Sequence, residues 1–139
     1  MGRLIDSSVL VSMERRGLSL NKLPAGAMDE GVALASITVS ELLAGVHRAN
    51  TPERKLRREA FIEGILESMP VLPFDLRLAR LHARLWAQLA ASGQMVGSHD
   101  LIIGATALAY GYSVLTENLR DFRRIPDLVV EQAQWSTSY

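Results

Sequence analysis

Four acidic residues stand where a carboxylate could do chemistry: Asp6, Glu41, Asp100 and Asp121. Asp6 and Glu41 come shortly after apolar runs, Asp100 begins a largely apolar helical stretch, and Asp121 lies on a polar turn. Carboxylates gathered in this way, without cysteine or paired histidines, suit a hard divalent cation such as Mg²⁺ or Mn²⁺. Such an ion positions a phosphate and lowers the pKa of a bound water. The set therefore predicts hydrolysis of a phosphodiester.

The elements that must position these acids follow from the pattern of apolar residues. Strands are predicted at 3–5, 32–37, 71–74, 112–116 and 128–130, with 71–74 at a sheet edge because prolines flank and interrupt it. Helices are predicted from Asp6 to about 16, and at 21–30, 38–49, 52–68, 75–91 and 98–110, with a turn or short helix at 121–126. Strands that alternate with helices predict an α/β fold with a parallel sheet covered on both faces. Ligands of such sheets bind at the carboxyl ends of the strands.

Each acid also has a purely structural interpretation. Asp6 is placed to cap the next helix, and Glu41 is spaced to form a capping box with Thr38. Asp100 would meet the positive end of its own helix dipole, and Asp121 would simply be solvated. Taken singly, none of the four is a specific signal. The functional hypothesis rests on their joint placement.

The stretch 98–118 is the segment around which the other predictions are arranged. It contains a serine cap at Ser98, a helix apolar nearly all round and therefore buried, a glycine turn at Gly111, and a strand. Asp100 then lies at the mouth of the core and needs partners, because an unpaired buried charge costs several kcal/mol or shifts its pKa. Gly104, on the same helix face, either leaves room for a ligand or permits close helix packing.

Composition narrows the function classes. The chain has 139 residues, 48% of them hydrophobic, which predicts one domain (1–139) with a substantial core. There is no cysteine, which excludes disulfides and thiolate chemistry. The longest apolar run is about half of the roughly 20 residues that a membrane span needs, so we expect a cytoplasmic protein without a membrane partner. The sequence also lacks the HExxH, P-loop and GxSxG motifs.

Basic residues are balanced by acids overall, 15 against 15, so nucleic acid would have to be held by a local patch. One basic cluster occupies 54–58 and another comprises Arg120, Arg123 and Arg124. Most such clusters are solvated helix faces. The second lies nearer to the predicted acidic edge and is the one expected to hold phosphates there.

Four segments together resemble one protein family. They are LIDSSVL at 4–10, SITVSELLAGVHRA at 36–49, HDLIIGATALAYGYSVLTENLRDF at 99–122 and IPDLVVE at 125–131. Their order and content are similar to the PIN-domain ribonucleases, specifically the VapC toxins of VapBC toxin–antitoxin pairs. The resemblance spans nearly the whole chain.

The resemblance implies a three-layer α/β/α sandwich and an Mg²⁺-dependent endoribonuclease that acts on RNA, with Mn²⁺ as a substitute ion. It implies that Asp6, Glu41 and Asp100 hold the metal and that Asp121 joins them in catalysis. Asn118 stands where many relatives have an acid, and is assigned a supporting role with Thr116 and Ser7. The family implies a homodimer and a VapB-type antitoxin as partner.

Two rival hypotheses remain open at this point. In the first, the same carboxylates are structural caps, and the protein is a catalytically silent module that acts with an antitoxin in DNA-bound regulation. In the second, the fold carries a nuclease directed at DNA. The identity of the RNA target and the number of metal ions are not encoded in any pattern we recognise.

Overall fold

The centre of the computed structural model, which describes residues 2–23 and 30–135, is a parallel sheet of five strands. The strands run in the order β3-β2-β1-β4-β5, and every neighbouring pair is parallel. Their bounds are β1 (Arg3–Ile5), β2 (Val32–Ala35), β3 (Val71–Leu72), β4 (Ser113–Thr116) and β5 (Val130–Gln132). The predicted edge position of the 71–74 strand is confirmed, since β3 ends the sheet. Parallel pairing requires a crossover between neighbours, and helices supply it.

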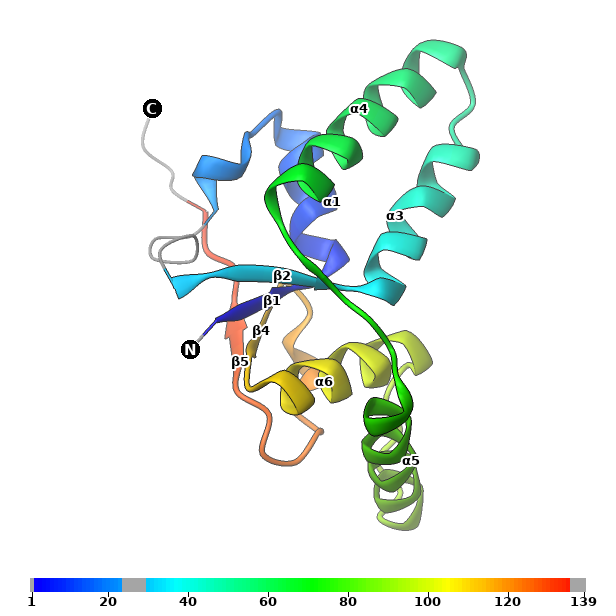
Figure 1. The fold of residues 1–139 in the computed structure, drawn as a ribbon, viewed down its shortest axis with the longest axis vertical. Helices are drawn as coiled ribbons and strands as arrows, with labels where there is room; N and C mark the ends of the chain where they lie inside the picture. Colours follow the sequence, from blue (N-terminus) through cyan, green and yellow to red (C-terminus); the bar gives the residue numbers. More distant parts are fainter. Residues whose placement is uncertain (1, 24–29, 136–139) are drawn as a thin grey trace.

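Helices cover both faces of the sheet, so the predicted α/β/α sandwich is confirmed (Figure 1). One layer contains α1 (Ser7–Arg16), α3 (Ser36–His47) and α4 (Pro52–Ser68). The other contains α5 (Leu76–Ala91) and α6 (Ser98–Tyr110), with the short α7 (Leu119–Phe122) beside them. A single 3-10 turn, η1 (Leu20–Lys22), follows α1. It covers the start of the helix predicted at 21–30, while 24–29 lie outside the described residues.

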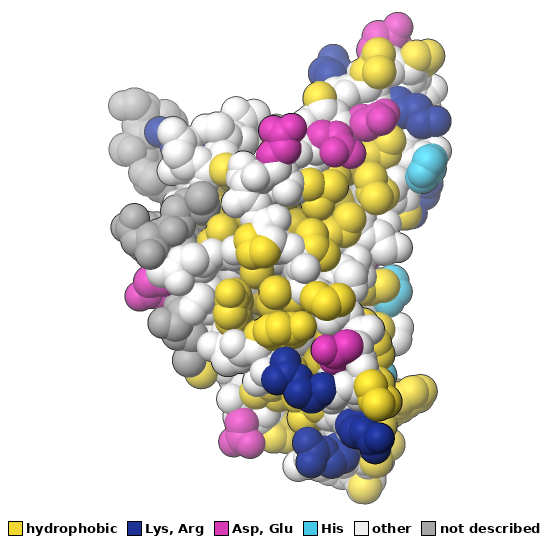
Figure 2. All heavy atoms as spheres, viewed as in Figure 1, with side chains coloured by type: hydrophobic (Ala, Val, Ile, Leu, Met, Phe, Trp, Pro, Cys, Tyr) yellow, Lys and Arg dark blue, Asp and Glu magenta, His cyan; other side chains and the backbone are white. Residues whose placement is uncertain are grey.

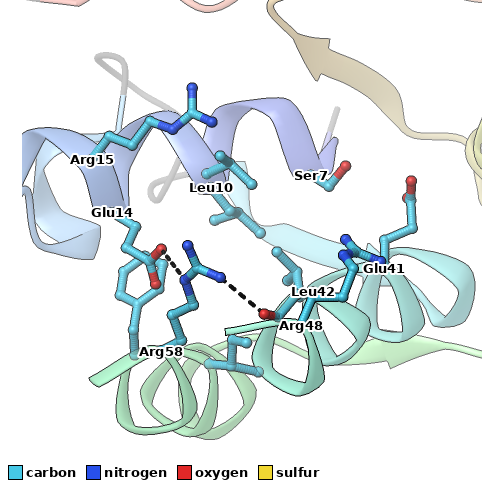
Figure 3. A pocket seen from close by; sticks show the side chains of 12 residues that line it. Ser7, Leu10, Glu14, Arg15, Glu41, Leu42, Arg48 and Arg58 are labelled. Carbon is cyan, nitrogen blue, oxygen red and sulfur yellow. Dashed lines mark hydrogen bonds and ion pairs between the residues drawn. The ribbon is translucent and has the colours of Figure 1, made fainter. Parts of the chain in front are cut away.

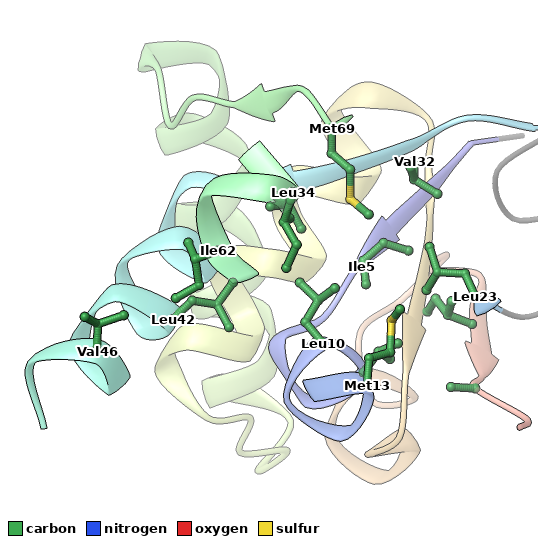
Figure 4. Packing of buried hydrophobic residues seen from close by; sticks show 14 residues of the cluster. Ile5, Leu10, Met13, Leu23, Val32, Leu34, Leu42, Val46, Ile62 and Met69 are labelled. Carbon is green, nitrogen blue, oxygen red and sulfur yellow. The ribbon is translucent and has the colours of Figure 1, made fainter. Parts of the chain in front are cut away.

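Two hydrophobic clusters hold the layers together because neighbouring strand residues point to opposite faces. Ile5 and Leu34 pack with α1, α3 and α4, a packing shown in Figure 4. Leu4 and Ala33 belong to the opposite cluster with α5 and α6. Both sheet faces are thus covered, which explains why the central strands read as continuous apolar runs rather than alternating ones.

The boundary between β2 and α3 differs from prediction. The strand ends at Ala35 and the helix begins at Ser36, two residues before Thr38. Thr38 therefore lies inside the helix instead of capping it, and its buried hydroxyl has no hydrogen-bond partner among the described residues. The predicted capping box is wrong for this reason, and Glu41 is left free for another role.

The segment 98–118 folds as predicted in outline. The central residues of α6 are buried, and Gly111 ends the helix in the left-handed conformation (φ 71°), which a residue without a Cβ adopts readily. Gly104 serves close packing rather than a ligand, because a Cβ there would collide with Ile125 and touch Leu128. Ser98 is the first helical residue and its side chain does not cap the helix, so that detail of the prediction is wrong.

The face shown in Figure 2 carries hydrophobic side chains in its middle, with basic side chains below them. Large exposed hydrophobic residues occur around β3 and α5, among them Val71, Phe74, Leu76 and Trp86. Within the described ranges, none of the helices has the length and hydrophobicity required to cross a membrane.

Candidate functional site

The acidic residues meet at a cavity of about 410 Å³ on the edge where the strands end. Asp6 follows β1, Asn118 follows β4, and Glu41 lies on the second turn of α3, which follows β2. Asp100 lies in the first turn of α6, whose first turn reaches this same edge. The sequence pattern left that last point open, and the structure decides it. The cavity is lined by Asp6, Ser7, Ser8, Val11, Ser12, Arg15, Glu41, Asp100, Glu117 and Asn118.

Asp6 is fixed by hydroxyl groups. Its carboxylate, in a side chain only 4% exposed, accepts hydrogen bonds on Oδ2 from Ser8 Oγ at 2.7 Å and from Thr116 Oγ1 at 2.8 Å. Although Asp6 occupies the N-cap position of α1, its side chain makes no capping bond to the helix. The capping interpretation is therefore wrong. None of the hydrogen bonds among described residues reaches the second oxygen, Oδ1.

The two hydroxyls are themselves held by the backbone that leaves β4. The Glu117 N–H donates to Ser8 Oγ at 3.1 Å, and the Asn118 N–H donates to Thr116 Oγ1 at 2.9 Å. Thr116 is fully buried. Because each hydroxyl accepts from the backbone and donates to Asp6, the orientation of the carboxylate is determined by the sheet edge itself. Thr116 therefore supports the site from beneath the cavity, whereas Ser7 lines it directly.

One oxygen of the Glu41 carboxylate lacks a hydrogen-bond donor in the part of the chain that the structure describes. Its Oε1 is buried and has no hydrogen-bond partner among the described residues. Its Oε2 lies 3.4 Å from His99 Nδ1. A buried carboxylate oxygen without a donor costs free energy, and such a group in a native structure calls for a ligand or an ion.

Asp100 sits in the strongest field of the site. Burial and, after it, repulsion from the carboxylates of Asp6, Asp121 and Glu41 raise the pKa of its carboxyl from 3.8 to about 6, while His99 acts in the opposite direction. A favourable helix dipole would lower this pKa, so the dipole interpretation does not describe the balance at this residue. A carboxyl group with a raised pKa among other acids is typical of a functional site.

Asp121 lies beside the cavity rather than in its wall. Its Oδ2 accepts a hydrogen bond from the Gly97 N–H at 3.3 Å, and its Oδ1 is 3.9 Å from guanidinium nitrogens of Arg120 and Arg124. A Cβ on Gly97 would lie 3.6 Å from Asp100 Oδ2 and 3.7 Å from Asp121 Oδ2. Asp121 thus reaches Asp100 through its charge, and it is not merely solvated.

The donor set fits a hard divalent cation. All the converging ligands are oxygens, and Glu41 Oε1 is buried without a partner. In the parts of the chain that the structure describes, no three acidic or histidine side chains are arranged to bind one ion together. Mg²⁺ does not require this, because it usually keeps several waters and uses one or two protein carboxylates.

Sequence reasoning missed four polar contributors to this cavity. Ser8, Ser12 and Arg15 follow each other at spacings of four and three residues on α1, so they share the helix face that begins beside Asp6. That spacing was readable and was not used. Glu117 was also missed. Its Oε1 accepts a hydrogen bond from Trp135 Nε1 at 2.7 Å, and no local sequence pattern indicates this contact.

Comparison with known proteins gives the family. The PIN-domain model matches residues 3–128. The chain is 35% identical over 130 residues to Ribonuclease VapC1 of Rickettsia felis, covering 94% of this chain and 95% of that protein. It is 37% identical over 100 residues to the tRNA(fMet)-specific endonuclease VapC of Salmonella typhimurium, with 72% and 74% covered.

A solved structure agrees with these sequence relatives. The crystal structure of VapBC-5 from Mycobacterium tuberculosis, a member of the VapBC family of toxin–antitoxin systems, contains a chain 32% identical to this one. The superposition has a TM-score of 0.72 and covers 94% of this chain and 95% of that chain. With the acids placed at the carboxyl ends of a parallel sheet, the chain belongs to the PIN-domain family, as a nuclease of the VapC group.

Proposed function

We propose that this protein is the endoribonuclease toxin of a toxin–antitoxin pair and that it hydrolyses RNA with the help of Mg²⁺, for which Mn²⁺ can substitute. The observation that carries the proposal is the meeting of Asp6, Glu41 and Asp100 at one cavity, with Glu41 Oε1 buried and unpartnered. The ribonuclease names of the relatives favour RNA over DNA as the substrate.

Asp6, Glu41 and Asp100 would hold the cation, directly or through its waters. When bound, the ion neutralises the scissile phosphate and lowers the pKa of the attacking water. Ser8 and Thr116 keep the Asp6 carboxylate in one orientation, so that ligand binding does not have to order it. Asp100 must lose its proton to act as a ligand, which its pKa of about 6 permits at neutral pH. Asn118 supports the cavity wall, and Asp121 adjusts the charge at Asp100.

The partner proposed for this chain is a VapB-type antitoxin. The support is its similarity to the toxin–antitoxin complex of Mycobacterium tuberculosis across nearly the whole chain. The homodimer stays a prediction, and the exposed Phe74, Leu76 and Trp86 offer an apolar surface for it. Co-expression with the neighbouring reading frame, followed by purification of a stable complex, tests the antitoxin.

The activity is tested with labelled RNA and DNA oligonucleotides of the same sequence, with and without Mg²⁺. We expect cleavage of RNA that EDTA abolishes and that Mn²⁺ restores. Asp6→Asn should reduce the rate by about 100-fold or more, since one lost electrostatic contact to a transition state costs that much. Glu59→Gln, an exposed carboxylate on α4, is the matched control and should cleave normally.

Two results would contradict the proposal in different ways. Purified protein that binds its antitoxin but cleaves neither polymer would support the catalytically silent module. Cleavage of DNA at a rate equal to that of RNA would support a nuclease without RNA preference.

A further inference from the structure

A second hollow adjoins the acidic cavity and shares lining residues with it. It has a volume of about 330 Å³ and lies between α1, α3 and α4 (Figure 3). Ser7, Val11, Arg15 and Glu41 line both hollows, so the two are immediate neighbours. A third hollow of about 390 Å³ continues from it along α1 and α4, and Arg15 lines that one too. We call the second and third hollows together the arginine cleft.

Five arginines surround the arginine cleft, namely Arg15, Arg48, Arg54, Arg57 and Arg58. The sole acid in its wall beyond Glu41 is Glu14, among the lining residues that the structure describes. Because the whole chain has as many acids as bases, this concentration of positive charge is local. The acidic cavity and the arginine cleft thus form adjacent regions of opposite sign.

The arginines have different roles. Arg58 is structural, because it donates to the Gly45 carbonyl at 2.9 Å and lies 3.6 Å from Glu14, which joins α1, α3 and α4. Arg15, Arg48 and Arg57 make no side-chain hydrogen bond or ion pair to any other described residue. Their side chains are exposed, so their guanidinium N–H groups are available to a ligand.

The cluster of Arg120, Arg123 and Arg124, which the sequence favoured as the phosphate holder, is partly used within the protein. Arg124 donates to the Met95 carbonyl at 2.5 Å, and Arg120 and Arg124 lie near the Asp121 carboxylate, while Arg123 is exposed. These contacts tie α7 to the loop before α6. The cluster at 54–58, which the sequence gave no reason to prefer, lines a cleft that lies next to the acidic cavity.

The floor of the arginine cleft is apolar. Leu42 and Ile62 are buried there, and Phe61 is partly buried beside them. An aromatic ring next to free arginines is the combination that binds single-stranded nucleic acid, since bases stack on the ring and phosphates pair with the guanidinium groups.

The geometry points to a substrate subsite: we propose that the arginine cleft holds the RNA strand on one side of the scissile phosphate. Arg48 and Arg15 contact the phosphates next to the acidic cavity, Arg57 contacts one farther along, and a base rests against Phe61. The inference rests on the proposed ribonuclease function. It explains how a polyanion approaches a cavity lined by carboxylates, because the neighbouring cations offset the repulsion.

The spacing of residues along α3 agrees with a strand that runs from the acidic cavity along the arginine cleft. Arg48 comes seven residues after Glu41, two turns along the same helix face, which is about 10 Å along the axis. Arg15 likewise comes seven residues after Ser8 on α1. Both helices therefore lead away from the acidic cavity toward α4, and the free arginines mark one path for the strand.

The test measures binding rather than cleavage. A short fluorescein-labelled single-stranded RNA is titrated in EDTA, and its affinity is followed by fluorescence anisotropy over a series of KCl concentrations. Each phosphate contact contributes about 0.7 to the slope of log K against log salt for a single strand. Arg48→Ala and Arg57→Ala should each lower the slope by about that amount. Phe61→Leu should weaken binding by about tenfold and leave the slope unchanged.

The control is Arg84→Ala on α5, which removes an equally exposed positive charge from the opposite layer and should leave the slope unchanged. Wild-type slope and affinity in both arginine variants would overturn the inference, and would leave the arginine cleft to an acidic protein partner instead. No RNA binding by the wild-type protein would also overturn it. Arginine-dependent RNA binding without Mg²⁺-dependent cleavage would uphold the arginine cleft while refuting the ribonuclease, so the two failures are distinguishable.

Discussion

Asp6 and Asp100 line the same cavity but are held in opposite ways. Asp6 is nearly fully buried, and two hydroxyls donate to one of its oxygens. No hydrogen bond from another described side chain reaches the Asp100 carboxyl, whose pKa is raised to about 6 by burial and, after it, by repulsion from three carboxylates. Hydrogen bonds fix the Asp6 carboxylate, whereas burial and repulsion set the state of the Asp100 carboxyl. In the proposed cation site, one ligand would be fixed by folding and the other would be stabilised when the ion binds.

The largest expected effect comes from removing the charge of Asp100. Its folded-state pKa is raised, so its favourable contribution to stability is present below its normal pKa of 3.8 and is lost as the pH rises through about 6. Asp100→Asn should therefore raise the free energy of unfolding of the metal-free protein by about 1 kcal/mol near neutral pH, after allowance for solvent screening. The gain should fade below about pH 4. The same variant should lose about 100-fold or more in RNA cleavage.

Denaturant unfolding near neutral pH and below about pH 4 measures this change in the free energy of unfolding. Asp6→Asn serves as the comparison variant. That variant should lose activity to a similar extent without becoming more stable, because it weakens a hydrogen-bonded arrangement. Equal stabilisation by both variants would contradict the distinction drawn between Asp6 and Asp100.

The next effect concerns the hydroxyls beneath Asp6. Thr116→Val removes the donor to Asp6 Oδ2 and the acceptor of the Asn118 N–H, which should cost about 1–3 kcal/mol of stability. Cleavage should fall by about 10-fold to 100-fold, as expected for a residue that orients a metal ligand. Unfolding and single-turnover cleavage are measured together.

Two variants make this result specific. Thr116→Ser should restore most of the cleavage rate, since the hydroxyl returns. Thr106→Val removes a buried hydroxyl that donates to the Ile102 carbonyl within α6, far from Asp6 in the hydrogen-bond network. If Thr106→Val lowered cleavage as much as Thr116→Val, the effect would be one of general destabilisation.

The smallest effect is expected at Asp121, which acts on Asp100 through charge. Asp121→Asn should move the acid limb of the pH–rate profile to lower pH, because one of the carboxylates that raise the pKa of Asp100 is lost. Since Asp121 is partly exposed, the change in rate at neutral pH should be about fivefold or less. A loss as large as that of Asp100→Asn would instead make Asp121 a ligand of the ion.

Much of this arrangement was predictable because strand order and helix ends leave local signals. Asp6 and the residues after β4 follow apolar runs, and the carboxyl ends of parallel strands must share one edge. The capping box at Thr38 was a wrong prediction because local spacing does not reveal that the helix begins two residues earlier, at Ser36. The position of Asp121 also depends on Gly97, a loop glycine 24 residues earlier in the chain, and no short pattern records that contact.

The two basic clusters also could not be distinguished from the sequence. Both look like solvated helix faces in the sequence, and only packing distinguishes them. Arg58 contacts α1 and α3 from its place on α4. Arg57, beside it, has no partner among the described residues. Distance along the chain favoured the cluster near Asp121, whereas in the folded chain α4 lines the hollow next to the acidic cavity.

The hydrogen bond from Trp135 to Glu117 places an intrinsic fluorophore at the edge of the acidic cavity. Its indole also lies against the guanidinium of Arg16, 5.4 Å from the ring centroid. The chain has two tryptophans, and the other, Trp86, is exposed on α5. Replacing Trp86 with phenylalanine would therefore leave a single tryptophan beside the cavity wall. Binding of the proposed ion should change its emission, so that occupancy could be followed without a label and without any substrate.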